Sequence, residues 1–361
     1  MTVAQLTENL LPGDAISRNA LALQKALQAA GFNAPLHTPH DALRTPARQT
    51  APALLPERLG PEDVLLYHYS TGSALNELFF SLPCRKAIVY HNVTPAEFFE
   101  PWDARAADRA HLGREQLALG AGCTEFALAD SAYSARELME LGYKNVSVLP
   151  LLTEPISATP DRALLSTLQD GSVNLLFVGR KVPNKRIEDL IAFTAFCARG
   201  LDRRVRLVLP GDDSMGSYCT ALRALIAETG APVLCLGRVS EQELAAAYAA
   251  ADVYISFSAH EGYGAPLVEA MAAGVPVLAY AAAAVPETMG TAGVLFDAPD
   301  YAALAAAVDL LRRGGAARET VLESQRRRCA EIQQAQTGQV LLQALARQNI
   351  LSPAAAGGET E

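Results

Sequence analysis

The stretch 252–280, DVYISFSAHEGYGAPLVEAMAAGVPVLAY, predicts a strand, a loop, a helix and a second strand. The strand-like runs are 252–258 and 275–280, and the helix between them is expected from Pro266 to Ala273. Proline suits the first turn of a helix, where its missing N–H costs nothing. Two strands joined through a helix indicate parallel pairing, so this stretch favours an α/β sheet over an antiparallel one.

The same alternation extends along the chain in two series. Other expected strands are 2–6, 63–70, 86–92, 125–131, 145–151, 173–180, 205–211 and 231–239, and other expected helices are 16–31, 132–142, 187–200, 240–251, 302–313 and a helical tail to 347. A chain of 361 residues exceeds what one core usually organises. We therefore predict two Rossmann-like, doubly wound domains, 1–160 and 161–335, hinged within 151–172, followed by 336–361 as a helix and a disordered tail.

Composition narrows the class of protein. The net charge of -9 argues against a general nucleic-acid binder, which needs clustered Lys and Arg. The six cysteines include no C-x-x-C pair, so a reducing, cytoplasmic location is the simplest interpretation. The N-terminus resembles no signal peptide, and no apolar run approaches the ~20 residues that span a bilayer.

Two carboxylates flank the glycine-containing loop of the opening stretch. Glu261 precedes Gly262 and Gly264, and Glu269 follows about one turn into the expected helix. Glycines allow a ligand to approach the backbone, and a helix N-terminus attracts anions. A carboxylate can accept hydrogen bonds from two hydroxyls of a sugar. The alternative is that Glu269 complements the helix dipole while Glu261 is a solvated loop acid.

A second loop, 180–186, places four cations after a strand that ends near Gly179. They are Arg180, Lys181, Lys185 and Arg186. Cations before a helix N-terminus suit a diphosphate, whereas the simpler interpretation is a solvated basic loop. The chain contains no D-x-D, so no metal site that would neutralise a leaving diphosphate is predicted. Arg180 and Lys185 are the cations available to neutralise it instead.

The first domain also has polar residues at expected strand ends. His91 follows one strand and His68 lies on another, although a lone histidine at a strand end is more often structural. Gly13 and Asp14 occupy the first strand-to-helix turn, where Asp14 is equally suited to cap the helix. The G-x-G-x-x-G fingerprint is missing there, which counts against a NAD enzyme.

Three segments together resemble a known family: FVGRKVPNKRIEDLI, LGRVSEQELAAAYAAADVYISFSAHEGYGAPLVEAMAAGVPVLAY and AVPETMGTAGVLFDAPD. They are similar to the retaining nucleotide-sugar glycosyltransferases of family four (group 1), which have the GT-B architecture of two Rossmann-like domains facing a central cleft. The resemblance covers most of 173–310. Over 1–150 it is weaker and rests on GDAIS, YHNVTP and ADSAYSARELMELG.

The resemblance implies a role for each matching residue. Glu261 would contact hydroxyls of the donor sugar, Glu269 would hold the ribose, and Arg180 and Lys185 would bind the diphosphate. Backbone amides of the loop and helix start would meet the sugar and phosphates, in the segment that contains Gly262, Gly264, Ala265, Pro266 and Leu267. The base would lie near a separate loop that contains Arg238 and Val239. The first glycine loop, with Gly13, would line the donor site. His91 would lie near the transferred sugar, although this chain has HN where many relatives have HD.

The activity implied is metal-independent, cofactor-free transfer of a hexose with retention, in which charge on the leaving diphosphate is stabilised. GDP-mannose is the first donor expected and UDP-hexoses follow. Other interpretations are a noncatalytic sugar-nucleotide-binding subunit, or an epimerase or phosphorylase of the same fold.

The expected acceptor is a saccharide or lipid-linked sugar of polysaccharide or lipopolysaccharide biosynthesis. The stretch 100–119, with Trp102, could rest on an anionic inner membrane face, but an exposed amphipathic helix is the simpler interpretation.

Overall fold

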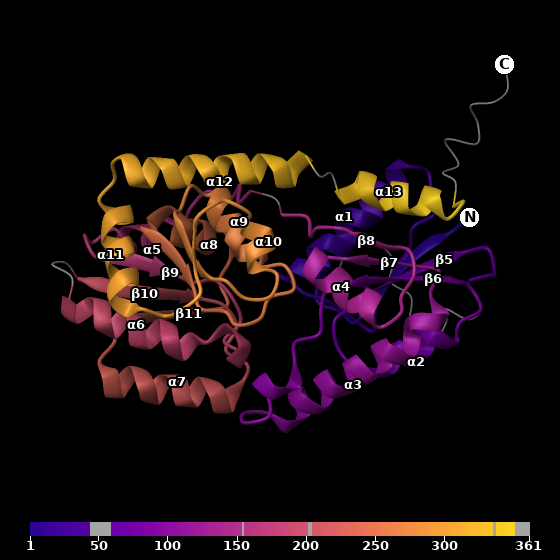
Figure 1. Cartoon of the computed structure of the whole chain (residues 1–361), viewed down its shortest axis with the longest axis horizontal. Coiled ribbons are helices and arrows are strands. Elements are labelled where there is room, and N and C mark those ends of the chain that lie inside the picture. Colours follow the sequence, from indigo (N-terminus) through magenta and orange to yellow (C-terminus); the bar gives the residue numbers. More distant parts are fainter. Residues whose placement is uncertain (44–58, 154, 201–203, 335–336, 351–361) are drawn as a thin grey trace, which may run out of the picture. The chain divides into compact units, whose positions relative to one another are not determined.

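The computed structural model describes residues 1–361 except 44–58, 154, 201–203, 335–336 and 351–361 (Figure 1). Contacts divide the chain into two compact units. The first unit comprises Met1–Ala96, Arg105–Leu152 and Gln334–Glu361, and the second comprises Glu97–Ala104 and Thr153–Gln333. The predicted domain limits at 160 and 335 stay a prediction, and the expected disordered tail lies outside the described residues.

The first unit is built on a six-stranded parallel sheet. In spatial order its strands are β3 (Leu36–His37), β1 (Val3–Thr7), β5 (Val64–Tyr69), β6 (Arg85–Tyr90), β7 (Phe126–Ala129) and β8 (Val146–Val148). Every residue of β1 and β5 is buried, because helices cover both faces of a parallel sheet. A separate parallel pair joins β2 (Asn9–Leu10) to β4 (His40–Asp41).

Helices flank this sheet on both sides. Figure 1 shows α1 (Ala15–Ala29) and α13 (Thr337–Arg347) on one side and α2 (Ala74–Ser81) and α3 (Ala104–Gly120) on the other. The unit also contains α4 (Ala132–Glu140) and the 3-10 turn η3 (Ala121–Cys123). Leu341 and Leu345 of α13 join the core that Leu23 and Leu27 of α1 form with the strands.

The second unit repeats the architecture around another parallel sheet. Its strands, in spatial order, are β11 (Val233–Gly237), β10 (Val205–Pro210), β9 (Val173–Leu176), β12 (Val253–Ser256), β13 (Val277–Tyr280) and β14 (Val294–Phe296). Numbered within the unit, this is the order 3-2-1-4-5-6 of the doubly wound fold. The predicted fold class is confirmed, and the strand order reverses between β9 and β12.

The helices of the second unit are α5 (Arg162–Leu168), α6 (Ile187–Gly200), α7 (Gly216–Thr229), α8 (Glu241–Ala250), α9 (Ala265–Ala272), α10 (Val285–Met289), α11 (Tyr301–Arg312) and α12 (Ala316–Gln334), with 3-10 turns η2 (Ala96–Phe98) and η4 (Pro183–Lys185). Figure 1 shows α6 and α7 on one side of the sheet and α8, α9 and α12 on the other. None of the helices in the described ranges is long and apolar enough to cross a membrane.

Two segments differ in detail from the sequence-based expectation. The polar stretch expected as a hinge contains α5, whose N-terminus is capped by Asp161 and whose Leu168 is fully buried. Trp102 precedes α3 and belongs to the second unit, where its ring meets Tyr218 edge-on at 5.0 Å and its carbonyl accepts a hydrogen bond from Ser217 (2.5 Å). The tryptophan therefore packs within that unit instead of lying on the helix proposed to meet a membrane.

Candidate functional site

The loop after β9 presents Lys185 at the end of a short 3-10 turn. Pro183 begins the turn, and Arg186 ends it in the left-handed region at φ 50 before α6 starts at Ile187. Asn184 binds the loop after β12 through two hydrogen bonds: its side-chain amide donates to the backbone carbonyl of His260 (2.9 Å), and its backbone carbonyl accepts from the backbone N–H of Ala259 (2.8 Å). The two loops on either side of the sheet's reversal point are thus held together.

This junction brings Lys185 against Glu261. The Lys185 Nζ lies 2.6 Å from Glu261 Oε2, and the two side chains are only 17% and 15% exposed. An ammonium group has three hydrogens to donate, so the ion pair leaves Lys185 able to bind a further anion. Two residues that the sequence placed in different motifs therefore form one charged pair at the reversal point, where doubly wound folds bind ligands.

Gly264 turns the loop into α9. It is the N-cap residue at φ 89, in the left-handed region that glycine adopts without strain. Ala265, Pro266 and Leu267 follow as the first turn of the helix, with Pro266 at its expected place. The first backbone N–H groups of a helix lack partners within the helix, and together with the helix dipole they favour an anion.

Glu269 lies on α9 and is 5% exposed. The hydroxyl of Tyr248, on α8, donates to its Oε2 at 3.1 Å, and Tyr248 stacks on Tyr254 of β12 with centroids 6.4 Å apart. Burial, then the charge of Glu261 and, more weakly, that of Glu269 raise the pKa of the Tyr254 hydroxyl well above its ordinary value. The charges of both glutamates therefore reach the Tyr254 hydroxyl, and their shared contact with a ligand stays a prediction.

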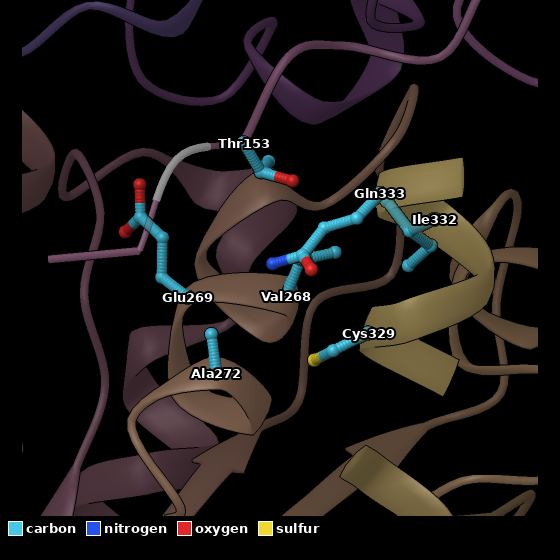
Figure 2. Close-up of a pocket in the computed structure, with 7 residues that line it drawn as sticks. All are labelled: Thr153, Val268, Glu269, Ala272, Cys329, Ile332 and Gln333. Atoms are coloured by element: carbon cyan, nitrogen blue, oxygen red, sulfur yellow. The ribbon is translucent and has the colours of Figure 1, made fainter. Parts of the chain in front are cut away.

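A small pocket lies on the other flank of α9 (Figure 2). It is lined by Thr153, Val268, Glu269, Ala272, Cys329, Ile332 and Gln333. Figure 2 shows the carboxylate of Glu269 directed away from the side chains of Cys329 and Gln333. The Glu269 carboxylate, which accepts the hydrogen bond from Tyr248, is therefore turned away from these two pocket residues.

The other cations of the first loop have different surroundings. Arg180 is exposed in the loop after β9, whereas Lys181 is 5% exposed and its Nζ donates to the carbonyl of Gly211 at 2.9 Å. A Cβ at Gly211 would lie 1.8 Å from the carbonyl oxygen of Gly179, so only glycine allows this approach. Lys181 is therefore a buried support of the strand ends.

The predicted base-binding loop follows β11. Arg238 is 69% exposed at its side chain and its Nε donates to Asp212 Oδ1 at 2.9 Å. Burial tends to raise the pKa of Asp212, but hydrogen bonds from Ser214 and Arg238 outweigh this and lower it. Asp212 stays ionised and orients Arg238, while Val239 follows, half-buried, before α8.

In the first unit, the residues of the first glycine loop form a helix cap. Asp14 is the N-cap of α1, and its Oδ2 accepts hydrogen bonds from the backbone (2.8 Å) and hydroxyl (2.7 Å) of Ser17. Gly13, just before it, has open space around its Cα. The capping interpretation of Asp14 accounts for these contacts, and the predicted ligand contact of Gly13 stays a prediction.

His91 directly follows β6, and its side chain is only 1% exposed. Its Nδ1 lies 2.9 Å from Asp130 Oδ2 and its Nε2 lies 2.9 Å from Nδ1 of His68. Both ring nitrogens are therefore occupied by groups of the same unit. The sequence singled out His91 and His68 but not Asp130, which directly follows the neighbouring strand β7.

Asn92 explains why HN replaces HD in this chain. The residue has φ 68, which asparagine tolerates, and its amide donates to Ser134 Oγ (3.0 Å) and Glu137 Oε2 (3.2 Å). Glu137 also binds Tyr90 and Arg114. An aspartate in this position would place a second carboxylate against Glu137.

We expect Asn92→Asp to lower the free energy of unfolding by about 1–3 kcal/mol, because the buried amide that donates to Glu137 is replaced by a carboxylate with the same charge as Glu137. Adding Glu137→Gln should recover part of the loss, since the glutamine amide can donate to the new carboxylate. The matched control is Asn145→Asp, at an exposed asparagine with φ 52, with an expected change within about 0.5 kcal/mol. Urea denaturation measures all four proteins, and equal losses at Asn92 and Asn145 would contradict the explanation.

Known proteins resemble this chain in sequence and in fold. Residues 166–330 match the family model described as glycosyl transferases group 1. The second unit belongs to the group 1 glycosyl transferases. O-antigen chain mannosyltransferase B from Escherichia coli is 33% identical over 134 residues, covering 36% of this chain and 34% of that protein. The MMP alpha-(1->4)-mannosyltransferase of Mycolicibacterium hassiacum is 45% identical over 71 residues, covering 19% and 17%.

The chain thus spans about a third or less of the length of these curated relatives. Among solved structures, Anabaena Alr3699/HepE in complex with UDP-glucose superposes with a TM-score of 0.72 at 17% identity, covering 97% of this chain and 100% of that one. This likeness shows the fold, which is the GT-B architecture with two Rossmann-like sheets. The group 1 match includes Lys185, Glu261 and Glu269, so the charged pair and the buried glutamate lie inside the recognised region.

Proposed function

We propose that the chain is a retaining, metal-independent glycosyltransferase that moves a hexose from a nucleotide diphosphate sugar to a saccharide or lipid-linked acceptor. Mannose from GDP-mannose is the first donor proposed. The observation that carries the proposal is the contact between Lys185 and Glu261 at the reversal point of a group 1 unit. It places a cation for phosphate and an acceptor for sugar hydroxyls within one hydrogen bond of each other.

In this proposal Lys185 and Arg180 bind the diphosphate and stabilise the charge that develops on it as the sugar departs. The N-terminus of α9 adds backbone donors, and Glu261 binds hydroxyls of the sugar. Glu269 holds the ribose, and Arg238 and Val239 flank the base. His91, in the first unit, supports the transfer step, and the sequence offers no covalent nucleophile, so retention would proceed by attack on the face that the diphosphate leaves.

Mannose is supported by the two relatives named as mannosyltransferases. A specific observation also favours a second donor class, because the solved structure with the same fold contains UDP-glucose. UDP-hexose transfer is therefore the alternative.

The O-antigen relative supports a polysaccharide acceptor. We propose that the transfer takes place on the cytoplasmic side of a membrane, where the exposed Arg105 and Arg109 of α3 would meet anionic lipid.

Nucleotide diphosphates test the donor directly. We expect GDP to raise the melting temperature and UDP to leave it nearly unchanged, because a ligand that binds only the folded state adds about 2.7 kcal/mol at 100 times its Kd. Stabilisation by UDP alone would select the UDP-hexose alternative. If neither nucleotide stabilises the protein, the donor site itself is wrong. Release of GDP from GDP-mannose with candidate acceptors then separates an enzyme from a noncatalytic subunit, which would bind without turnover.

A further inference from the structure

Four buried polar side chains form a line across the sheet of the first unit. Gln5 lies on β1, His68 on β5, His91 directly after β6 and Asp130 directly after β7. The sheet order β1-β5-β6-β7 makes these strands consecutive neighbours, so each side chain meets the next. The line crosses the boundary between β1 and β5, where the strand order of this sheet reverses, and no single stretch of sequence contains it.

Each member of the line contacts the next at hydrogen-bonding distance. The Gln5 amide nitrogen donates to the carbonyl of Ala20 at 3.1 Å, and its Oε1 lies 2.9 Å from His68 Nε2. His68 Nδ1 lies 2.9 Å from His91 Nε2, with the two rings within 6° of parallel. His91 Nδ1 ends the line 2.9 Å and 3.0 Å from the two oxygens of Asp130.

The carbonyl of Ala20 sets the direction of these bonds. A carbonyl only accepts, so the Gln5 amide nitrogen must face it and the Gln5 oxygen must face His68. His68 Nε2 therefore carries the hydrogen. Burial first, and the neighbouring His91 second, lower the pKa of His68 well below its ordinary value, so the ring is neutral and its Nδ1 accepts from His91 Nε2–H.

One proton then remains to be placed, at the contact between His91 and Asp130. With its hydrogen on Nε2, a neutral His91 would turn a bare Nδ1 toward a carboxylate, and two acceptors in contact in the interior cost an unmade hydrogen bond. The pair must hold one proton, on the ring or on the carboxyl. Burial raises the pKa of Asp130 while His91 opposes the rise, which agrees with a shared proton.

We propose that Gln5, His68 and Asp130 are positioning residues that hold His91, and with it the turn at the end of β6, in a single protonated arrangement required for transfer. The inference rests on the proposed function only in assigning His91 to the transfer step. A core packed with apolar residues would hold the fold at least as well as buried polar groups do. The polar line adds a single orientation for the His91 ring. His91 is followed by Asn92, whose backbone adopts the left-handed conformation.

Histidine nitrogen NMR of the full chain tests the proton arrangement. The chain has six histidines, and His68→Asn and His91→Ala assign the two signals. We expect His68 in the Nε2–H form, unchanged between about pH 5 and 8, a window that spans the ordinary pKa of histidine. Gln5→Leu removes the acceptor, so His68 should switch to the Nδ1–H form. A wild-type His68 in the Nδ1–H form, or one that titrates normally, would overturn the proton assignment.

Kinetics of two Asp130 variants test the positioning role. Asp130→Leu leaves His91 Nδ1 without a partner, and we expect kcat to fall about tenfold or more while the donor KM stays within about twofold, since the donor site lies in the other unit. Asp130→Asn, whose amide can donate to His91 Nδ1, should recover most of kcat. Loss of kcat in both variants alike, with folding intact by circular dichroism, would show that the carboxylate charge itself is required and would overturn the positioning role.

The two proposals fail in different ways. Full turnover by His91→Ala removes His91 from the transfer step and ends the positioning role, whatever the spectra show, while the donor site stands or falls by nucleotide binding. Full turnover by Asp130→Leu, with His91→Ala inactive, overturns only the positioning residues.

Discussion

Replacement of Lys185 by alanine is expected to lower kcat/KM for the nucleotide sugar about 100-fold or more. The proposed role of Lys185 is to stabilise negative charge that grows as the sugar leaves, and loss of one such preorganised donor typically costs about 10²–10³ in rate. Because the interaction strengthens in the transition state, kcat should fall more than the affinity for the donor. Steady-state kinetics with varied GDP-mannose measure the effect.

The ion pair with Glu261 complicates this replacement and also provides its control. Lys185→Ala leaves a largely buried carboxylate without its cation, which should lower the free energy of unfolding by about 1–2 kcal/mol. The double variant Lys185→Ala with Glu261→Gln should regain that stability without regaining turnover. Lys25→Ala, at an exposed position of α1, removes one positive charge elsewhere and should leave both quantities unchanged.

Two results would contradict the assignment. If Lys185→Ala keeps wild-type turnover, Lys185 does not stabilise the leaving group. If the double variant regains turnover together with stability, the pair maintains the loop and takes no part in the chemistry.

Glu269→Ala is expected to weaken nucleotide diphosphate binding about 10- to 100-fold. Hydrogen bonds to a charged group contribute about 1.5–3 kcal/mol each, and the proposed partners are the ribose hydroxyls. Inorganic pyrophosphate has no ribose, so its affinity should be the same for the variant and the wild type. Isothermal titration with both ligands separates loss of the ribose contact from collapse of the phosphate site.

Tyr248→Phe refines the same test. It removes the hydroxyl that donates to Glu269 and keeps the ring that stacks on Tyr254, so we expect a weaker loss of nucleotide affinity, about threefold to tenfold. Glu228→Ala, at an exposed glutamate of α7, is the control for loss of a carboxylate. Unchanged nucleotide binding by Glu269→Ala, or an equal loss for pyrophosphate, would refute the ribose role.

Much of the second unit could be predicted from the sequence because its signals are local. β9 and β12 are mostly apolar, and the loops that follow carry their charges within a few residues of each strand end. The meeting of Lys185 and Glu261, 76 positions apart, follows once both loops are assigned to neighbouring strand ends. The family resemblance selected Lys185 over Lys181, whereas residue type alone did not, since the two lysines lie on one short loop whose turn decides their directions.

The first unit shows the opposite case. The sequence predicts no role for Asp130, because within ADSAYS it lies at an ordinary strand end that is followed by a helix. Its contact with His91 joins positions 39 apart, and that of His68 with Gln5 joins positions 63 apart. These distances depend on strand register, which periodicity within one strand does not contain.

The amino-acid order by itself determined the class of fold, the run of strands and helices, and the loops that carry charge, since each depends on residues close together in the chain. The tertiary structure alone decided which of those charges are paired and which are buried as supports. The physical reason is that a buried polar atom needs a partner, and the partner comes from whichever strand the folded sheet places beside it.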